Sequence, residues 1–218
     1  DSPQLHVKIN KEGAIMVKVL TIPDRWSAKD IPDLTGKRFL ITGATSGIGL
    51  AAATELARRN AQVVITARSE EKAKAAIKKI GPGLVSSLIM DLTDLSTVRK
   101  AAASIDTPFD VVVLNAGVMA TPFTKTVDGF ELQMGTNHLG HFAFAGLLHQ
   151  KVRERMVVVS SFVHRMGSFG DNSQIGELKW VYFLKLHQSG KVSATPLKLL
   201  ALESLNLMKS QENVFLLS

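Results

Sequence analysis

The residues that most clearly indicate a chemical function are three glycines, Gly43, Gly47 and Gly49. They lie between a β-prone apolar run and an alanine-rich run of helical periodicity. Glycine adopts positive φ angles and carries no side chain, so this order predicts a strand, a turn open to an anion, and a helix. The first N–H groups of that helix, together with its dipole, attract phosphate. We therefore expect a phosphate-binding loop, the alternative being an ordinary strand-to-helix turn.

Each glycine has a separate expected role in this loop. Gly43 turns the backbone off the strand, Gly47 lets main-chain N–H groups approach a pyrophosphate, and Gly49 lets the helix pack close to the sheet. The loop residues expected to bind a cofactor are Gly43, Thr45, Ser46, Gly47, Ile48 and Gly49. The expected ligand is therefore a pyrophosphate at the start of the helix.

The spacing Thr42-Gly-x-x-x-Gly-x-Gly resembles the short-chain dehydrogenase/reductase family, over roughly residues 34 to 217. Two further segments, Asn115–Met119 and Thr136–Phe142, resemble its retinol-dehydrogenase-like branch and bacterial relatives. The resemblance implies an oxidoreductase that transfers hydride between a nicotinamide and a carbonyl or alcohol on a lipophilic small molecule.

The resemblance also implies cofactor contacts after two later strands. It places Asp91 and Leu92 at the adenine pocket, and Asn115, Ala116 and Gly117 beside the cofactor, where glycine leaves room for it. The alternative for Asp91 is the cap of the helix that begins soon after it.

Two catalytic roles follow from the same resemblance. Asn137 matches the asparagine that holds a water in the proton relay, and Ser161 matches the serine that hydrogen-bonds the substrate. A buried asparagine needs partners for its amide in any case, and a serine at the end of a strand is also common in turns. Both alternatives stay open from the sequence.

The end of the second core strand distinguishes two cofactors. An NAD enzyme usually carries an acidic residue there for the ribose hydroxyls, whereas this chain has Thr66-Ala67-Arg68. A guanidinium pairs bidentately with phosphate, so Arg68 favours NADP(H). The alternative is a solvated arginine at a helix start.

The tyrosine and lysine of the family, four residues apart, are not found where they are expected. The lysine lowers the pKa of the tyrosine, so that the phenol exchanges a proton near neutral pH. In bacterial relatives a tryptophan precedes the tyrosine by about ten residues and a glutamate follows the lysine by about nine. Counted from Trp180 and Glu203, the two positions hold Gly190 and Ala194, and Tyr182 has no lysine at i+4. A non-catalytic NADP-binding sensor or interaction protein is therefore the alternative function.

Neighbouring residues do not restore the pair. His187 and Lys191 have the spacing but not the register, which favours a surface histidine. Pro196 favours a helix that begins there, because proline is accepted in a first helical turn. Such a helix would exclude residues 190 to 194.

The elements that must position these residues alternate between strands and helices. Strands are expected at residues 38–42, 62–67, 84–90, 110–114, 156–159 and 214–218, and helices from the glycine loop to 59, at 70–80, from about 95, and at 134–148. This order predicts a Rossmann-type, doubly wound α/β domain in three layers with a mostly parallel sheet. Residues 1–33 are expected to form an arm with a β-hairpin and a lead-in, and residues 34–218 one NADP-binding domain, incomplete at its C-terminus.

Composition limits the remaining classes. The chain has 218 residues, 45% of them hydrophobic, which suffices for a single core, and it has no cysteine for disulfides or thiolate chemistry. Its net charge of +7 comes from basic residues interspersed with acidic ones, so no nucleic-acid partner is expected. Neither a long apolar run nor a leader is visible, which predicts a cytoplasmic protein without a membrane span. No metal site is expected, and a homo-oligomer is left open.

Overall fold

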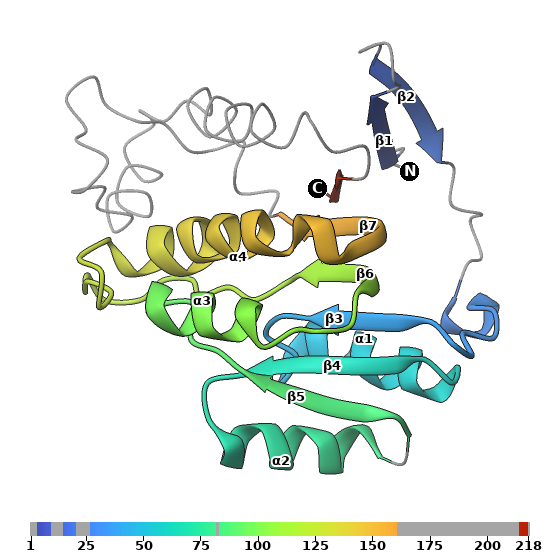
Figure 1. Ribbon diagram of the computed structural model, residues 1–218, viewed down its shortest axis with the longest axis horizontal. Helices are drawn as coiled ribbons and strands as arrows, with labels where there is room; N and C mark the ends of the chain where they lie inside the picture. The colour runs from blue at the N-terminus through green and yellow to red at the C-terminus, as the bar shows by residue number, and fades with distance from the viewer. Residues whose placement is uncertain (1–3, 10–14, 21–26, 82, 161–213, 218) are drawn as a thin grey trace.

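The computed structural model describes residues 4–9, 15–20, 27–81, 83–160 and 214–217. Its main sheet has six parallel strands in the order β5-β4-β3-β6-β7-β8 (Figure 1). The strands are β3 (Arg38–Ile41), β4 (Gln62–Ala67), β5 (Val85–Ile89), β6 (Phe109–Leu114), β7 (Val152–Val159) and β8 (Val214–Leu217). The order reverses between β3 and β6, which confirms the predicted doubly wound fold.

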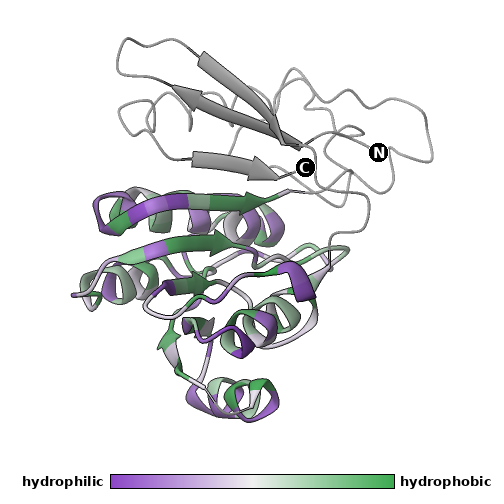
Figure 2. Cartoon of the chain, turned by 90° about the vertical axis from the view of Figure 1, so that its right-hand side faces the viewer, coloured by the Kyte–Doolittle hydropathy of each residue, from purple (hydrophilic) through white to green (hydrophobic). Residues whose placement is uncertain are grey.

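Four α-helices of the described chain cover the two faces of this sheet. They are α1 (Gly47–Arg58), α2 (Glu70–Ile80), α3 (Leu95–Ala103) and α4 (Gly140–Leu148), and a π-helical turn, η2 (Met134–Leu139), leads into α4. Short 3-10 helices, η1 (Ala28–Asp30) and η3 (His149–Lys151), precede β3 and β7. Figure 2 shows helices divided between hydrophilic and hydrophobic residues, as expected for helices that cover a sheet.

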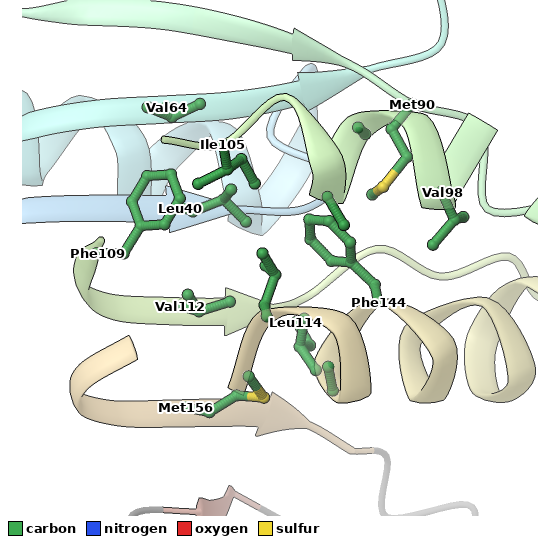
Figure 3. Close-up of a cluster of buried hydrophobic side chains, with 14 of the residues drawn as sticks. Leu40, Val64, Met90, Val98, Ile105, Phe109, Val112, Leu114, Phe144 and Met156 are labelled. Carbon is green, nitrogen blue, oxygen red and sulfur yellow. The ribbon is translucent and has the colours of Figure 1, made fainter. Parts of the chain in front are cut away.

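The alternation of side chains along the strands divides the core into two clusters. Leu40 and Val64 pack with Phe144 in the cluster shared with α3 and α4 (Figure 3). Their neighbours in sequence, Ile41 and Ile65, pack in the cluster shared with α1 and α2. Burial of such a side chain contributes roughly 1.5–3 kcal/mol. The strands are therefore apolar on both faces, as is typical of a parallel sheet between helices.

The N-terminal segment forms a separate two-stranded sheet. Strands β1 (Gln4–Ile9) and β2 (Ile15–Leu20) pair antiparallel, as the hairpin prediction requires. The turn expected at residues 10–13 lies outside the described residues. The division of the chain into an arm and a single domain stays a prediction.

Strand β7 begins at residue 152 rather than at the predicted 156. Its first residues are charged, which is unusual for an inner strand, but they have partners. Arg153 Nη1 lies 3.7 Å from Oδ1 of the buried Asp110, and Glu154 forms an ion pair with Lys37. Because the charges are paired at the amino edge of the sheet, the strand extends through them.

The expected helix at 134–148 begins as a π-helical turn, which the sequence pattern did not indicate. Two glycines allow close packing at this turn. A Cβ atom on Gly135 would lie 2.4 Å from Thr126 Cγ2, and one on Gly140 would lie 2.6 Å from the carbonyl oxygen of Leu92. The turn is therefore pressed against its neighbours, and it carries Asn137.

Candidate functional site

A cavity of about 840 Å³ lies beyond the carboxyl ends of the central strands. All twelve residues predicted to bind a cofactor line it. They are Gly43, Thr45, Ser46, Gly47, Ile48, Gly49, Arg68, Asp91, Leu92, Asn115, Ala116 and Gly117. Its place at the reversal of strand order is where open α/β sheets bind their ligands.

The three glycines of the loop are required for different reasons. Gly43 has a φ of +68°, and a Cβ atom there would lie 2.7 Å from the Cα of Ala116. On Gly49, a Cβ atom would lie 2.5 Å from the amide nitrogen of Asn115 and 2.7 Å from the Gly43 carbonyl oxygen. Gly47 has a φ of +56° and no atom within 4 Å of an added Cβ, so it faces open space. Two glycines thus serve packing, and Gly47 leaves the approach to α1 open.

The start of α1 differs from the starts of α2 and α3. Ser46 occupies the N-cap position of α1, but its side chain makes no capping hydrogen bond. By contrast, Ser69 caps α2 by accepting from the Lys72 N–H, and Asp94 caps α3 by accepting from the Ser96 N–H. The first turn of α1 also contains no acidic residue. Its N–H donors and partial positive charge are therefore directed at the cavity.

Thr42, at the end of β3, holds the two central loops together. Its hydroxyl oxygen accepts the N–H groups of Asn115 at 2.9 Å and Ala116 at 3.0 Å, and its carbonyl oxygen accepts from the Asn115 amide at 3.0 Å. The same hydroxyl lies 2.9 Å from Nε2 of His141. No local sequence pattern indicates a role for this hydroxyl or for His141, because their contact joins elements 99 residues apart in the chain.

His141 is buried, and burial lowers the pKa of its imidazole from an ordinary 6.5 to about 4. The neighbouring His138 lowers this pKa further, while the hydrogen bond between Nδ1 and the Asn137 carbonyl oxygen, 3.2 Å long, raises it. Burial also lowers the pKa of His138, which stacks on Phe142. His141 is therefore neutral near pH 7.

A cluster of cations borders the cavity on the α2 side. Arg68 is exposed, and it has no ion-pair partner within the described residues. Lys72 and Lys79 of α2 line the same cavity, which the sequence pattern alone did not indicate. The two lysines are seven residues apart, about two helical turns, and their shared face of α2 is the signal that could have found them. This border is electropositive and suits a phosphate group.

Asp91 does not cap α3, because Asp94 does so, and the helix-cap alternative is wrong. Oδ1 of Asp91 instead accepts the N–H of Thr93 at 2.9 Å and its hydroxyl at 2.8 Å, in an Asx turn. This turn holds the carboxylate at the border of the cavity.

Asn137 is exposed, which corrects the expectation of a buried asparagine. Its amide is nevertheless fully engaged by one residue. Oδ1 accepts the N–H of Val118 at 2.8 Å, and Nδ2 donates to the Val118 carbonyl oxygen at 2.8 Å. The side chain therefore fixes the segment that follows Gly117, and its proposed part in proton transfer stays a prediction.

The start of α1 supplies a test of whether a ligand fits the cavity. Its N–H groups have no capping side chain, and Gly47 leaves the approach to them open. Thr136 also lines the cavity and is 7% exposed, but its hydroxyl, which has no partner in the described part of the chain, is enclosed by protein atoms and does not by itself indicate a ligand. A ligand with a phosphate group fits the donors at the start of α1.

The remaining catalytic predictions lie outside the described residues. These are Ser161, Tyr182, His187, Gly190 and Ala194. Within the described ranges, no cluster of histidine and acidic side chains could hold a metal ion. No described helix has the length and apolar character needed to cross a membrane.

Comparison with known proteins identifies relatives of this site. A family model described as short chain dehydrogenase matches residues 37–172. Human retinol dehydrogenase 11 is 39% identical over 155 residues, which are 66% of this chain and 49% of that protein. An uncharacterised oxidoreductase of Schizosaccharomyces pombe is 43% identical over 136 residues, 59% of this chain and 40% of its own. The chain spans about half the length of these curated relatives or less.

Solved structures agree with the fold. The crystal structure of an uncharacterised protein from Mycobacterium paratuberculosis has a TM-score of 0.61 and 47% identity, over 64% of this chain and 51% of that one. A blue fluorescent protein from a metagenomic library, solved with NADPH, has a TM-score of 0.51 and 26% identity, over 61% of this chain and 58% of that one.

Proposed function

Because the chain belongs to the short-chain dehydrogenase family, we propose that it is an NADP(H)-dependent oxidoreductase acting on a carbonyl or alcohol group of a lipophilic small molecule. The observation that carries this proposal is the cavity into which α1 directs an N-terminus that no side chain caps. The N–H groups of the loop from Gly43 to Gly49 would bind the pyrophosphate. Asp91 and Leu92 would bind the adenosine.

The choice of NADP(H) over NAD(H) rests on charge. Arg68 has no ion-pair partner within the described residues, and Lys72, in the first turn of α2, lines the same cavity. A second phosphate on the adenosine ribose would satisfy these cations, whereas two ribose hydroxyls would not. The structural relative solved with NADPH supports the same choice.

A lipophilic substrate is supported by the relatives and by exposed apolar side chains on the segment that follows Val118. Retinol dehydrogenase 11 takes its name from an apolar alcohol. Met119, directly after the Val118 that Asn137 clasps, is 77% exposed, and Val127 further along the same loop is 76% exposed. Such side chains favour contact with an apolar molecule. Ser161 would hydrogen-bond the reacting oxygen, and Asn137 would hold a water for proton transfer.

Bound NADPH would supply hydride, but a proton must accompany it. Gly190 and Ala194 occupy the expected tyrosine and lysine positions and have no ionisable side chain. This observation favours a second function, a non-catalytic NADP-binding sensor or interaction protein. General acid–base catalysis contributes about 10²–10⁴-fold to a rate. With a panel of carbonyl compounds, this chain should therefore oxidise NADPH at least that much more slowly than its relatives do.

A cytoplasmic location and a homo-oligomer also stay predictions.

The proposal is tested by titrating the protein with NADPH and NADH, following cofactor fluorescence. Arg68→Ala should weaken NADPH binding by roughly ten-fold or more and leave NADH binding nearly unchanged, because only NADPH carries the 2′-phosphate on its adenosine ribose. Arg99→Ala, an exposed arginine on α3 outside the cavity, is the matched control. Equal losses for both cofactors would return Arg68 to a solvated role, and no binding of either by the unmodified protein would overturn the proposal.

A further inference from the structure

A chain of buried hydrogen bonds lies behind the cavity, and His141 is at its centre. The imidazole contacts the Thr42 hydroxyl through Nε2 at 2.9 Å and the Asn137 carbonyl oxygen through Nδ1 at 3.2 Å. Thr42 is completely buried and His141 is 6% exposed. The ring thus joins Thr42, directly after β3, to the π-helical turn η2, and both are bonded to residues that line the proposed cofactor site.

The partners of Thr42 determine where the protons are. A hydroxyl oxygen has two lone pairs and one hydrogen. Both lone pairs are engaged, because the oxygen accepts the N–H groups of Asn115 and Ala116. Its hydrogen is therefore donated to His141, and Nε2 of the ring must be unprotonated.

The tautomer of His141 follows. A neutral imidazole has one N–H, so the hydrogen must lie on Nδ1, where it is donated to the Asn137 carbonyl oxygen. Every atom of the chain then has a suitable partner. The other tautomer would direct two hydrogens at each other between Nε2 and Thr42, and would leave two acceptors facing each other at Nδ1. The lowered pKa of His141 agrees with a neutral ring.

The two ends of this chain continue into the cavity. Asn137 clasps both backbone groups of Val118, and Thr42 holds the N–H groups of Asn115 and Ala116. The segment from Asn115 to Val118 is thus fixed at its start by Thr42 and at its end by Asn137. His141 is the connection between these two anchors.

We propose that His141, as the Nδ1–H tautomer, is a positioning residue that sets the distance between the two anchors of the Asn115–Val118 segment and thereby shapes the site for the cofactor. This inference rests on the proposed function for its consequence in binding. The hydrogen-bond pattern itself does not depend on that function. The two are therefore tested by separate measurements on the full chain.

The first measurement is the nitrogen NMR spectrum of the histidine rings in the cofactor-free protein, with His141 assigned by the signals that vanish in His141→Phe or, if that variant does not fold, in His141→Asn. The expected result is an Nδ1–H ring that does not titrate between pH 6 and 8. Thr42→Ser keeps the hydroxyl and should preserve this tautomer. An Nε2–H ring, or titration near pH 6.5, would overturn the proposal whether or not any cofactor binds.

The second measurement is NADPH affinity. His141→Phe removes both ring hydrogen bonds and should weaken binding roughly ten-fold, since the hydrogen of the buried Thr42 hydroxyl loses its acceptor and the Asn137 carbonyl oxygen loses the ring N–H. His149→Phe is the matched control, because Nδ1 of His149 also contacts a backbone carbonyl, that of Gly146 at 2.6 Å, but away from the cavity.

The outcomes separate the two proposals. If the unmodified protein binds NADPH and His141→Phe binds it equally well, His141 is only a core residue and the positioning role is wrong. If the unmodified protein binds neither cofactor, the proposed function fails, while the NMR result still decides the hydrogen-bond chain. If both histidine variants lose affinity equally, the loss reflects the helix and not the site.

Discussion

The cavity has an α1 wall, at the start of α1 and Arg68, and an η2 wall, formed by Thr136 and the Asn115–Val118 segment. The two walls differ in whether their polar groups have partners within the protein. On the α1 wall, Ser46 provides no cap, Gly47 faces open space and Arg68 has no described ion-pair partner. On the η2 wall, the supporting side chains of Asn137 and His141 do not themselves line the cavity, and their polar atoms are paired with other protein groups. Groups without partners are arranged for a ligand, whereas groups with partners hold the scaffold.

Thr136 is the exception on the η2 wall, and it makes the comparison sharper. The residue lines the cavity, but its hydroxyl is enclosed by protein atoms and has no partner among the described residues. It lies next to Asn137, whose amide makes two hydrogen bonds. Adjacent residues can thus differ in whether their polar groups have protein partners. Variants of paired and of unpaired groups should therefore differ in their effects on the free energy of unfolding and on cofactor affinity.

The largest effect is expected at Gly49. In Gly49→Ala the added Cβ atom would meet the Asn115 amide at 2.5 Å and backbone oxygen at 2.7 Å, so α1 must move away from the sheet. We expect NADPH binding to fall by roughly a hundred-fold or more and stability to fall by roughly 1–3 kcal/mol, as in other overpacked sites. Gly146→Ala in α4 is the control, because its Cβ meets no atom within 4 Å, and it should be neutral or stabilising. Unchanged binding in Gly49→Ala would contradict the close packing.

Low pH should reduce the free energy of unfolding by protonating His141, which supports the η2 wall. Its folded-state pKa of about 4 lies below the ordinary 6.5, so the unfolded chain takes up the proton first. Its contribution to stability is complete above pH 6.5 and is lost as the pH falls toward 4, by roughly 3 kcal/mol in total. Urea unfolding of the wild type and of His141→Asn at pH 7 and 4.5 isolates this contribution, with His149→Asn as control. A variant that loses as much stability as the wild type over this range would contradict it.

Thr136→Val should separate stability from binding. It removes an unsatisfied buried hydroxyl while keeping the shape of the side chain, so the cofactor-free protein should gain about 1 kcal/mol. The same change should leave NADPH affinity within about two-fold, because the hydroxyl oxygen is enclosed and does not face the cavity. Thermal unfolding and fluorescence titration measure the two effects. A clear loss of affinity would show that the hydroxyl does contact the ligand.

The smallest effect is expected for stability in Ser46→Ala. Since the Ser46 side chain makes no capping bond, its removal should change the unfolding free energy by only a few tenths of a kcal/mol. Ser69→Ala, at the capped start of α2, should cost about 1 kcal/mol. Equal losses in the two variants would mean that both helices are capped in solution, and the contrast between the walls would not hold.

Local patterns were sufficient for much of this molecule. The glycines between an apolar run and a helical run predicted the loop, and the alternation of strands and helices predicted the parallel sheet. Both depend on short-range properties, namely backbone freedom and the period of apolar residues. For the same reason the residues of the cavity could be chosen before their contacts were known, because strand ends in such a fold converge on one edge.

Tertiary structure alone decided how these residues are held. Thr42 and His141 are far apart in the chain, and nothing local indicates that their side chains meet. Asp94 rather than Asp91 caps α3, and Asn137 pairs with Val118 on an exposed surface, because helix starts and loop paths depend on packing. The sequence by itself therefore determined which backbone segments can accept an anion. Which polar groups remain available for that anion was settled only by the long-range hydrogen bonds that occupy the others.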